Sequence, residues 1–348
     1  MRRFSIALLV AVTVAALTAA GAQAAPPQNR AVVIVSGGDA TSPFTTPGHA
    51  CASGLAAGNT DTALRADLLE HGYTVYTSPA MAGRGPVTDQ GGFGAFGDCP
   101  ITLPENMTVN STGSIDTAGE HLARFLTHLH DDYGVDELDV VGHSMGGLYS
   151  RAAIRVLQSL GSPVRIRSVT TIGTPWAGSY LSDYANGITA LSDCLGDQFC
   201  ETAMEGMRDE VQRLMAGSGR EVNQAFLMGP DGWNEYQAGV LDQIPVVLIG
   251  GDRFTAPAGR GAPNPTVWPN DGIVATTSAL AVAVSDRVLP HRRCVTFDDT
   301  HSIFVSNLAG LPWDTGLTWD PRVHDVVRDA IAGADGALAA PTRQGCPV

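Results

Sequence analysis

The fold is decided by the stretch Leu138-Asp-Val-Val-Gly142-His143-Ser144-Met145-Gly146-Gly147. Its apolar start predicts a buried strand, and the residues that follow it predict a helix to about Ser159. The pattern Gly-x-Ser-x-Gly therefore lies between a strand and a helix. A sharp turn in this context holds Ser144 in a strained backbone conformation with its hydroxyl exposed, and side chains at Gly142 and Gly146 would collide with neighbouring backbone.

Short apolar runs alternate with amphipathic segments along the rest of the chain. Strands are predicted at 31–36, 73–77, 166–172, 244–250 and 292–297, the last of the sheet, and helices at 61–70, 116–129 and 321–331. This alternation predicts an α/β protein with a mostly parallel central sheet flanked by helices. Between about 178 and 243 helical patterns dominate, which predicts a helical insertion of the kind that forms a lid or cap. Residues 336–348 have the pattern of a tail.

The first residues have the pattern of a targeting signal. Arg2 and Arg3 precede an apolar run from 6 to about 20, and Ala22-Gln23-Ala24 matches the A-x-A cleavage pattern. An uncleaved membrane anchor is the alternative, but the apolar run is short for a span. We therefore expect a signal peptide at 1–24, one catalytic domain at 25–348, and a secreted protein without stable membrane insertion.

Composition limits the partners that the protein can bind. The net charge is −14, which makes nucleic acid and anionic membrane surfaces poor partners, and oligomeric state is left open. Six cysteines in an exported chain predict up to three disulfides. Proximity along the sequence favours Cys51–Cys99, Cys194–Cys200 and Cys294–Cys346. No pair has the C-x-x-C spacing of a metal site, so a structural role is expected.

A serine hydroxyl needs a base, and the base needs an orienting acid, to become a nucleophile at neutral pH. The backbone N–H of Met145, at the start of the predicted helix, faces a developing oxyanion. With this turn the chain order is serine, acid, histidine. His301 is the predicted base because it follows the last predicted strand, whereas His291 precedes that strand and His324 lies on the closing helix.

Two aspartates are candidates for the acid. Asp252 follows the predicted strand at 244–250, and Asp271 lies in a turn signal, Asn270-Asp-Gly-Ile-Val274, that leads into an apolar stretch. Position along the chain alone leaves both open.

From Val32 to about Val305 the chain resembles the true lipases of bacteria, within the α/β-hydrolase superfamily. The resemblance rests on the turn at 142–147, on Asn270–Val274, which matches the motif N-D-G-[LIV]-V, and on Ile172–Ser179. That last run resembles the lipase segment G-T-P-H-x-G-S, with Trp176 in place of histidine. The same turn also occurs in GPI-inositol deacylases and lecithin-type acyltransferases.

The resemblance implies an α/β-hydrolase fold and assigns the acid to Asp271. It also implies a second oxyanion donor at the backbone N–H of Gly38. Those lipases carry His-Gly after the first core strand, whereas this chain has Ser36-Gly37-Gly38, so the side chain that braces the loop is different. Trp176 is a candidate for lining an acyl pocket, and ordinary core burial is its alternative.

These inferences predict a serine hydrolase that cleaves carboxylic esters through an acyl-enzyme, with an ester or lipid as substrate. Ser144, Asp271 and His301 form the predicted triad, and no cofactor or metal is expected. A lipase is favoured, partly because Met204, Met207 and Leu214 would form an apolar lid face unless they only pack the helix. A short-chain esterase, an acyltransferase and an inactive binding protein are the alternatives.

Overall fold

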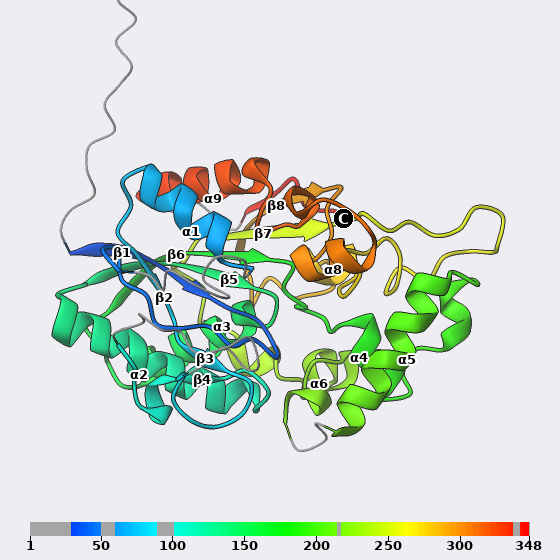
Figure 1. Ribbon diagram of the computed structural model, residues 1–348. Helices are drawn as coiled ribbons and strands as arrows, with labels where there is room; N and C mark the ends of the chain where they lie inside the picture. Colours follow the sequence, from blue (N-terminus) through cyan, green and yellow to red (C-terminus); the bar gives the residue numbers. More distant parts are fainter. Residues whose placement is uncertain (1–28, 50–59, 89–100, 214–216, 337–341, 348) are drawn as a thin grey trace, which may run out of the picture.

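The computed structural model describes residues 29–49, 60–88, 101–213, 217–336 and 342–347. Its centre is a sheet of seven parallel strands in the order β2-β1-β5-β6-β7-β8-β9 (Figure 1). The strands are β1 (Arg30–Val35), β2 (Val75–Thr77), β5 (Glu137–His143), β6 (Arg165–Ile172), β7 (Val246–Gly251), β8 (His291–Phe297) and β9 (Thr342–Gln344). Two short strands, β3 (Ala80–Met81) and β4 (Val109–Asn110), pair separately. The predicted parallel sheet is confirmed.

Helices cover both faces of this sheet (Figure 1). α2 (Ile115–Tyr133) and α3 (Gly146–Ser159) lie on one face, and α1 (Thr62–Glu70) and α9 (Pro321–Gly333) lie on the other. Alternate residues of β1 point to the two cores: Val33 packs with α2 and α3, whereas Val32 packs with α1 and α9. A strand buried on both faces is therefore apolar throughout, as its sequence is.

The chain between β6 and β7 is helical. It contains α4 (Tyr180–Ala185), α5 (Gln198–Arg213) and α6 (Gln224–Met228), with 3-10 turns at Leu191–Cys194, Ser218–Arg220 and Glu235–Gln237. The described part of this segment contains no strand, as predicted. Figure 1 shows its helices beside the sheet rather than against either face. The disulfide Cys194–Cys200 joins the start of α5 to the preceding turn.

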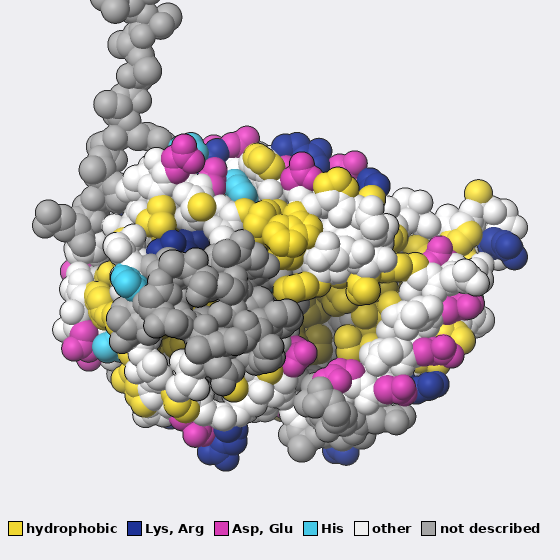
Figure 2. Space-filling model, in the orientation of Figure 1, with side chains coloured by type: hydrophobic (Ala, Val, Ile, Leu, Met, Phe, Trp, Pro, Cys, Tyr) yellow, Lys and Arg dark blue, Asp and Glu magenta, His cyan; other side chains and the backbone are white. Residues whose placement is uncertain are grey.

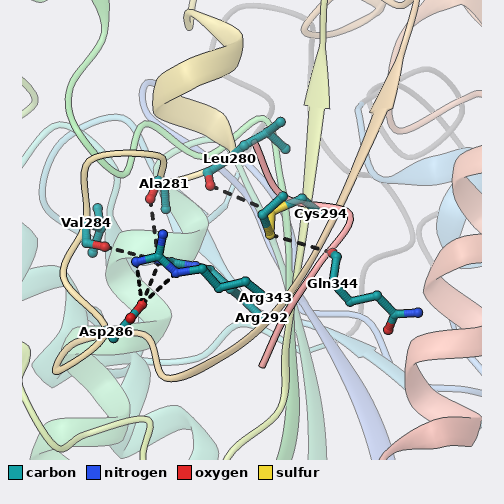
Figure 3. Close-up of a disulfide and its surroundings, with 9 residues drawn as sticks. Leu280, Ala281, Val284, Asp286, Arg292, Cys294, Arg343 and Gln344 are labelled. Carbon is teal, nitrogen blue, oxygen red and sulfur yellow. Dashed lines mark hydrogen bonds and ion pairs between the residues drawn. A yellow bond between two sulfur atoms is a disulfide. The ribbon is translucent and has the colours of Figure 1, made fainter. Parts of the chain in front are cut away.

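The prediction that the strand at 292–297 is the last one was wrong. β9 lies beyond it and pairs in parallel with β8, from His291 opposite Thr342 to Arg293 opposite Gln344. The disulfide Cys294–Cys346 holds the two strands together, and Asp286 pairs with an arginine from each strand (Figure 3). The three exposed polar residues of β9 have no apolar pattern by which a strand could be predicted.

Two of the three predicted disulfides are therefore confirmed. The pair Cys51–Cys99 and the predicted signal peptide lie outside the described residues. Among the residues that are described, none of the helices is both long and apolar enough to cross a membrane. The remaining short elements are the 3-10 turns Glu105–Met107 and Trp313–Thr315 and the helices α7 (Thr276–Ala279) and α8 (Ile303–Leu308).

Candidate active site

Ser144 occupies the tight turn between β5 and α3. Its φ is +54°, a left-handed conformation that residues other than glycine rarely adopt. A Cβ at Gly142 would lie 2.5 Å from the backbone nitrogen of Gly147, and one at Gly146 would lie 2.1 Å from the carbonyl oxygen of Val35. Both glycines are therefore required by close backbone contact, as the sequence predicted.

His301 and Asp271 come together from two loops at the carboxyl end of the sheet. The loop after β8 carries His301, and the loop after β7 carries Asp271. The Nδ1 of His301 lies 2.7 Å from Oδ2 of Asp271, and both residues are buried. Oδ1 of Asp271 accepts hydrogen bonds from the backbone N–H groups of Ile273 (2.9 Å) and Val274 (2.8 Å). The carboxylate is thus fixed in the orientation in which it holds the imidazole.

Gly173, at the end of β6, packs against this pair. Its φ is +60°, and an added Cβ would lie 2.9 Å from Nδ1 of His301 and 3.2 Å from Oδ2 of Asp271. A side chain here would push the histidine and the aspartate apart. The sequence contains this glycine within the segment Ile172–Ser179, but it does not indicate that the glycine is needed because His301 and Asp271 pack against it.

The other candidates for acid and base lie elsewhere. The backbone of Asp252 bonds to Phe297, at 2.9 Å, and burial followed by the charge of Asp298 raises the pKa of the Asp252 carboxyl. His291 begins β8, and Nε2 of His324 bonds to the carbonyl of Thr318 at 2.9 Å. The geometry therefore pairs His301 with Asp271 rather than with Asp252.

His143 is a neighbour of this pair that the sequence analysis treated only as part of the turn. Its Nε2–H donates to the backbone carbonyl of His301 at 2.9 Å, and the two rings lie 4.9 Å apart. Burial, then the charge of His301, lowers the pKa of His143 to about 3. His143 is therefore a neutral hydrogen-bond donor that holds the backbone of His301 in place.

Ser144 and His301 line the same apolar pocket, of about 410 Å³. Its walls come from α5, from α8 and from the loops after β6 and β7, and Figure 2 shows the hollow lined by hydrophobic side chains between α8 and α5. The apolar lining residues are Met145, Pro175, Met207, Val211, Val222, Ile273, Val274, Phe304, Val305 and Leu308. Two larger hollows, of about 720 and 630 Å³, contain neither Ser144 nor His301.

Gly38 and Met145 also line this pocket. A Cβ at Gly38 would lie 2.6 Å from Sδ of Met145, and one at Gly37 would lie 2.5 Å from Cβ of Ser144. In the part of the chain that the structure describes, the backbone N–H groups of Gly38 and Met145 have no hydrogen-bond acceptor in the protein. Two donors thus remain for an oxygen atom bound beside Ser144.

Trp176 does not line the pocket, which corrects the expectation that it contacts an acyl chain. Its ring is fully buried, and its Nε1 donates to Oγ1 of Thr171 at 3.1 Å. The guanidinium of Arg151 lies 4.2 Å from the centre of this ring and 4.8 Å from that of Trp233. Ordinary core burial, the alternative reading of Trp176, fits this position, where the ring stabilises a buried cation.

Three residues were predicted to form an apolar lid face. Met207 lines the pocket and Met204 is buried in a separate core with Cys194, whereas Leu214 lies outside the described residues.

The two carboxylates that precede His301 in the sequence pair with an arginine. Arg322 lies 3.2 Å from both Asp298 and Asp299. Among the described residues no group of three or more potential ligands has the arrangement of a metal site.

The parallel sheet, the serine turn and the histidine–aspartate pair define the fold as that of the α/β-hydrolases. Residues 101–194, which include the serine turn, match the family model described as "Putative serine esterase (DUF676)". A triacylglycerol lipase of Pseudarthrobacter phenanthrenivorans is 36% identical over 70 residues, which are 20% of this chain and 20% of that protein. A triacylglycerol lipase of Burkholderia plantarii is also 36% identical over 70 residues, 20% of this chain and 18% of the relative. The chain thus matches about a fifth of the length of these curated relatives.

Solved structures of similar proteins are more distant. The lipase BlEst2 of Bacillus licheniformis, in its propeptide form, is 14% identical with a TM-score of 0.46, and the match covers 79% of this chain and 47% of that one. The esterase Pf2001 of Pyrococcus furiosus is 16% identical with a TM-score of 0.45, covering 87% and 82% of the two chains. Similarity at this level says nothing about which substrate this chain takes.

Proposed function

We propose that the protein is a secreted serine hydrolase that cleaves carboxylic esters, with lipid esters as its substrates. The observation that carries the proposal is the buried His301–Asp271 pair, at 2.7 Å, whose histidine lines the same apolar pocket as the strained Ser144. An apolar pocket suits an acyl chain, and a serine that shares it with an oriented histidine suits acyl transfer.

In the proposed mechanism His301 removes the proton of the Ser144 hydroxyl, and the serine oxygen attacks the ester carbonyl. Asp271 keeps the Nδ1 proton in place and stabilises the imidazolium that forms. The backbone N–H groups of Met145 and Gly38 bind the oxyanion of the tetrahedral intermediate. His301 then protonates the leaving alcohol, and water releases the acid from the acyl-enzyme by the same steps.

The remaining parts of the proposal concern the chain as a whole. Residues 1–24 act as a signal peptide, residues 25–348 form the catalytic domain, and the helical segment at about 178–243 acts as a lid. The two disulfides support an oxidising compartment, and the pocket-lining Met207, Val211 and Val222 support a lid. Sequencing the amino terminus of the exported protein tests the signal peptide, because cleavage after Ala24 leaves Ala25 first.

Hydrolysis of p-nitrophenyl esters of increasing acyl length by residues 25–348 tests the activity. A lipase gives activity that rises toward long chains, whereas a short-chain optimum indicates an esterase, and transfer to an added alcohol in preference to water indicates an acyltransferase. Ser144→Ala should lose about 10⁴-fold or more in kcat. Ser159→Ala, on the exposed end of α3, is its matched control.

A second pair of variants tests the assignment of the acid. Asp271→Asn should lower kcat by about 10⁴-fold, because it favours the wrong histidine tautomer, while Asp252→Asn should change it little. If neither the wild type nor any variant turns over these esters, the hydrolase proposal fails and a binding role takes its place.

A further inference from the structure

Residues 36–39 form a loop over the serine turn, which we call the oxyanion loop. It follows β1 and carries Gly38, whose N–H is a donor in the proposed reaction. Carbonyl oxygens at its start lie against the turn: a Cβ at Gly146 would be 2.1 Å from the oxygen of Val35 and 2.8 Å from that of Ser36. The start of the loop therefore already packs closely against the turn at Gly146, so the position of the rest of the loop depends on the contacts that hold it from the other side.

One anchor of this loop is a hydrogen bond between buried side chains. The hydroxyl of Ser36 donates to Oδ2 of Asp61, and the two residues are 1% and 2% exposed. Asp61 is the residue before α1, so the bond ties the loop to the start of that helix. Burial raises the pKa of the Asp61 carboxyl to about 6. Because this value is still below neutral pH, the carboxylate is ionised at pH 7 and accepts the Ser36 hydrogen bond.

A second anchor holds the other end of the loop. The N–H of Asp39 donates to the carbonyl of Ser111 at 3.2 Å, and the hydroxyl of Ser111 donates to the carbonyl of Ala40 at 2.8 Å. Between the two anchors lie Gly37 and Gly38, which have no side chains to hold them. The direction of the Gly38 N–H is thus set by the anchors on either side.

We propose that the Ser36–Asp61 hydrogen bond is a positioning device, which aims the Gly38 N–H at the oxyanion formed at Ser144. The inference rests on the proposed function, and it gives a task to a buried serine–aspartate pair that does not line the pocket shared by Ser144 and His301. Placement matters because an oxyanion donor acts only within about 2.7–3.1 Å of the oxygen, and removing one donor costs about 10²–10³-fold in kcat.

The test compares Ser36→Ala with Ser168→Ala in the mature protein. Ser168 also donates to a buried carboxylate, that of Asp139 at 2.5 Å, but on β5 and β6 near the amino ends of the strands. The measurements are kcat and KM for p-nitrophenyl butyrate, the Ki of a trifluoromethyl ketone, whose adduct with the serine carries an oxyanion, and the melting temperature.

Ser36→Ala should lower kcat by about 10-fold or more, leave KM within about twofold, and raise Ki by the same factor as the loss in kcat. Ser168→Ala should lose comparable thermal stability while its kcat and Ki stay within about twofold of wild type. A purely structural role for Ser36 predicts the same kinetics for both variants, and that result would overturn the inference.

Two further variants keep the test informative if Ser36→Ala does not fold. Asp61→Asn retains an oxygen acceptor and should keep kcat within about threefold, whereas Asp61→Leu should reproduce the loss expected of Ser36→Ala. Their combination, Ser36→Ala with Asp61→Leu, should be no worse than either alone, because both remove one bond. Equal kcat in Asp61→Asn and Asp61→Leu contradicts the inference.

The outcomes for this inference and for the proposed function are distinct. A wild type that is inactive, or that Ser144→Ala matches, contradicts the proposed function and the positioning role with it. An active wild type, an inactive Ser144→Ala and an unaffected Ser36→Ala contradict the positioning role alone.

Discussion

Ser144 has a backbone conformation that works against the stability of the protein. A φ of +54° costs a residue with a Cβ on the order of 1–3 kcal/mol, and the turn keeps it because β5 and α3 fix both sides. The same conformation exposes the hydroxyl to the pocket. The backbone strain and the exposure of the hydroxyl to the pocket are therefore consequences of one turn.

We expect Ser144→Gly to be inactive and more stable than the wild type. Glycine adopts a positive φ without penalty, so the free energy of unfolding should rise by about 1 kcal/mol. Ser144→Ala also lacks the hydroxyl but retains the Cβ, so it should gain little. Urea unfolding of the three proteins measures this, and an equal gain in Ser144→Ala would show that the hydroxyl rather than the backbone is responsible.

We expect the stability of the wild type, relative to the variant Asp61→Asn, to be greater in mild acid than at neutral pH. Its folded pKa of about 6 is above the value of 3.8 for an unfolded chain, so the folded state keeps the proton longer. The stability that this contributes is present in full below pH 3.8 and is lost as the pH rises through 6. Relative to Asp61→Asn, the wild type should lose on the order of 2–3 kcal/mol of unfolding free energy between pH 4 and 7. A pH-independent difference between the two proteins contradicts this expectation.

At the scale of elements, the helical segment between β6 and β7 contributes one wall of the pocket. Val211 on α5 and Val222 before α6 face the same space as Ser144. If the pocket takes an acyl chain, as proposed, residues of this wall should set the length that fits, because the opposite wall contains Ser144 and His301.

We expect Val211→Trp to shift the acyl preference toward shorter chains. The larger ring would occupy part of the 410 Å³ pocket, so the ratio of decanoate to butyrate turnover should fall by about 10-fold. Ile188→Trp is the control, since Ile188 is an exposed residue of the same segment that does not line the pocket. An unchanged ratio in Val211→Trp would mean that long chains leave the pocket by another route.

Elements that rest on local patterns were predictable. Apolar runs gave the strands around β1, β5, β6, β7 and β8, and the glycines at 142 and 146 gave the serine turn. The meeting of Asp271 and His301 also followed, because both lie in loops at the carboxyl ends of parallel strands. The choice of Asp271 over Asp252 needed a family motif, since both follow β7.

Contacts between distant residues were not predictable. His143 and His301 are 158 residues apart in the sequence, and Ser36 and Asp61 are 25 apart, with nothing in either segment to indicate the bond. Trp176 was misplaced because an aromatic residue after a strand suits a pocket and a core equally well. In the structure its ring packs against Arg151 of α3, a contact that nothing near Trp176 in the sequence indicates.

At the scale of the whole molecule, the Cys294–Cys346 disulfide attaches the last strand to the sheet. β9 contributes only three residue pairs, so the covalent bond, which closes a loop of 52 residues, should supply most of its attachment. We expect the double variant Cys294→Ser/Cys346→Ser to lose about 2–4 kcal/mol of unfolding free energy. Its kcat should be unchanged because neither cysteine lines the pocket, and a loss of activity at full folding would contradict that separation.

Because the strands of the main sheet are parallel, they all begin at one edge of the sheet and all end at the opposite edge. The seven described strands of the main sheet are parallel and end on the side that contains Ser144 and His301, whereas β1 begins at Arg30 on the opposite side. A group attached ahead of Arg30 would therefore start from the edge of the sheet opposite the pocket. A solid support attached through residues ahead of Arg30 would lie on the side of the sheet opposite the pocket, and should leave the pocket open to solvent.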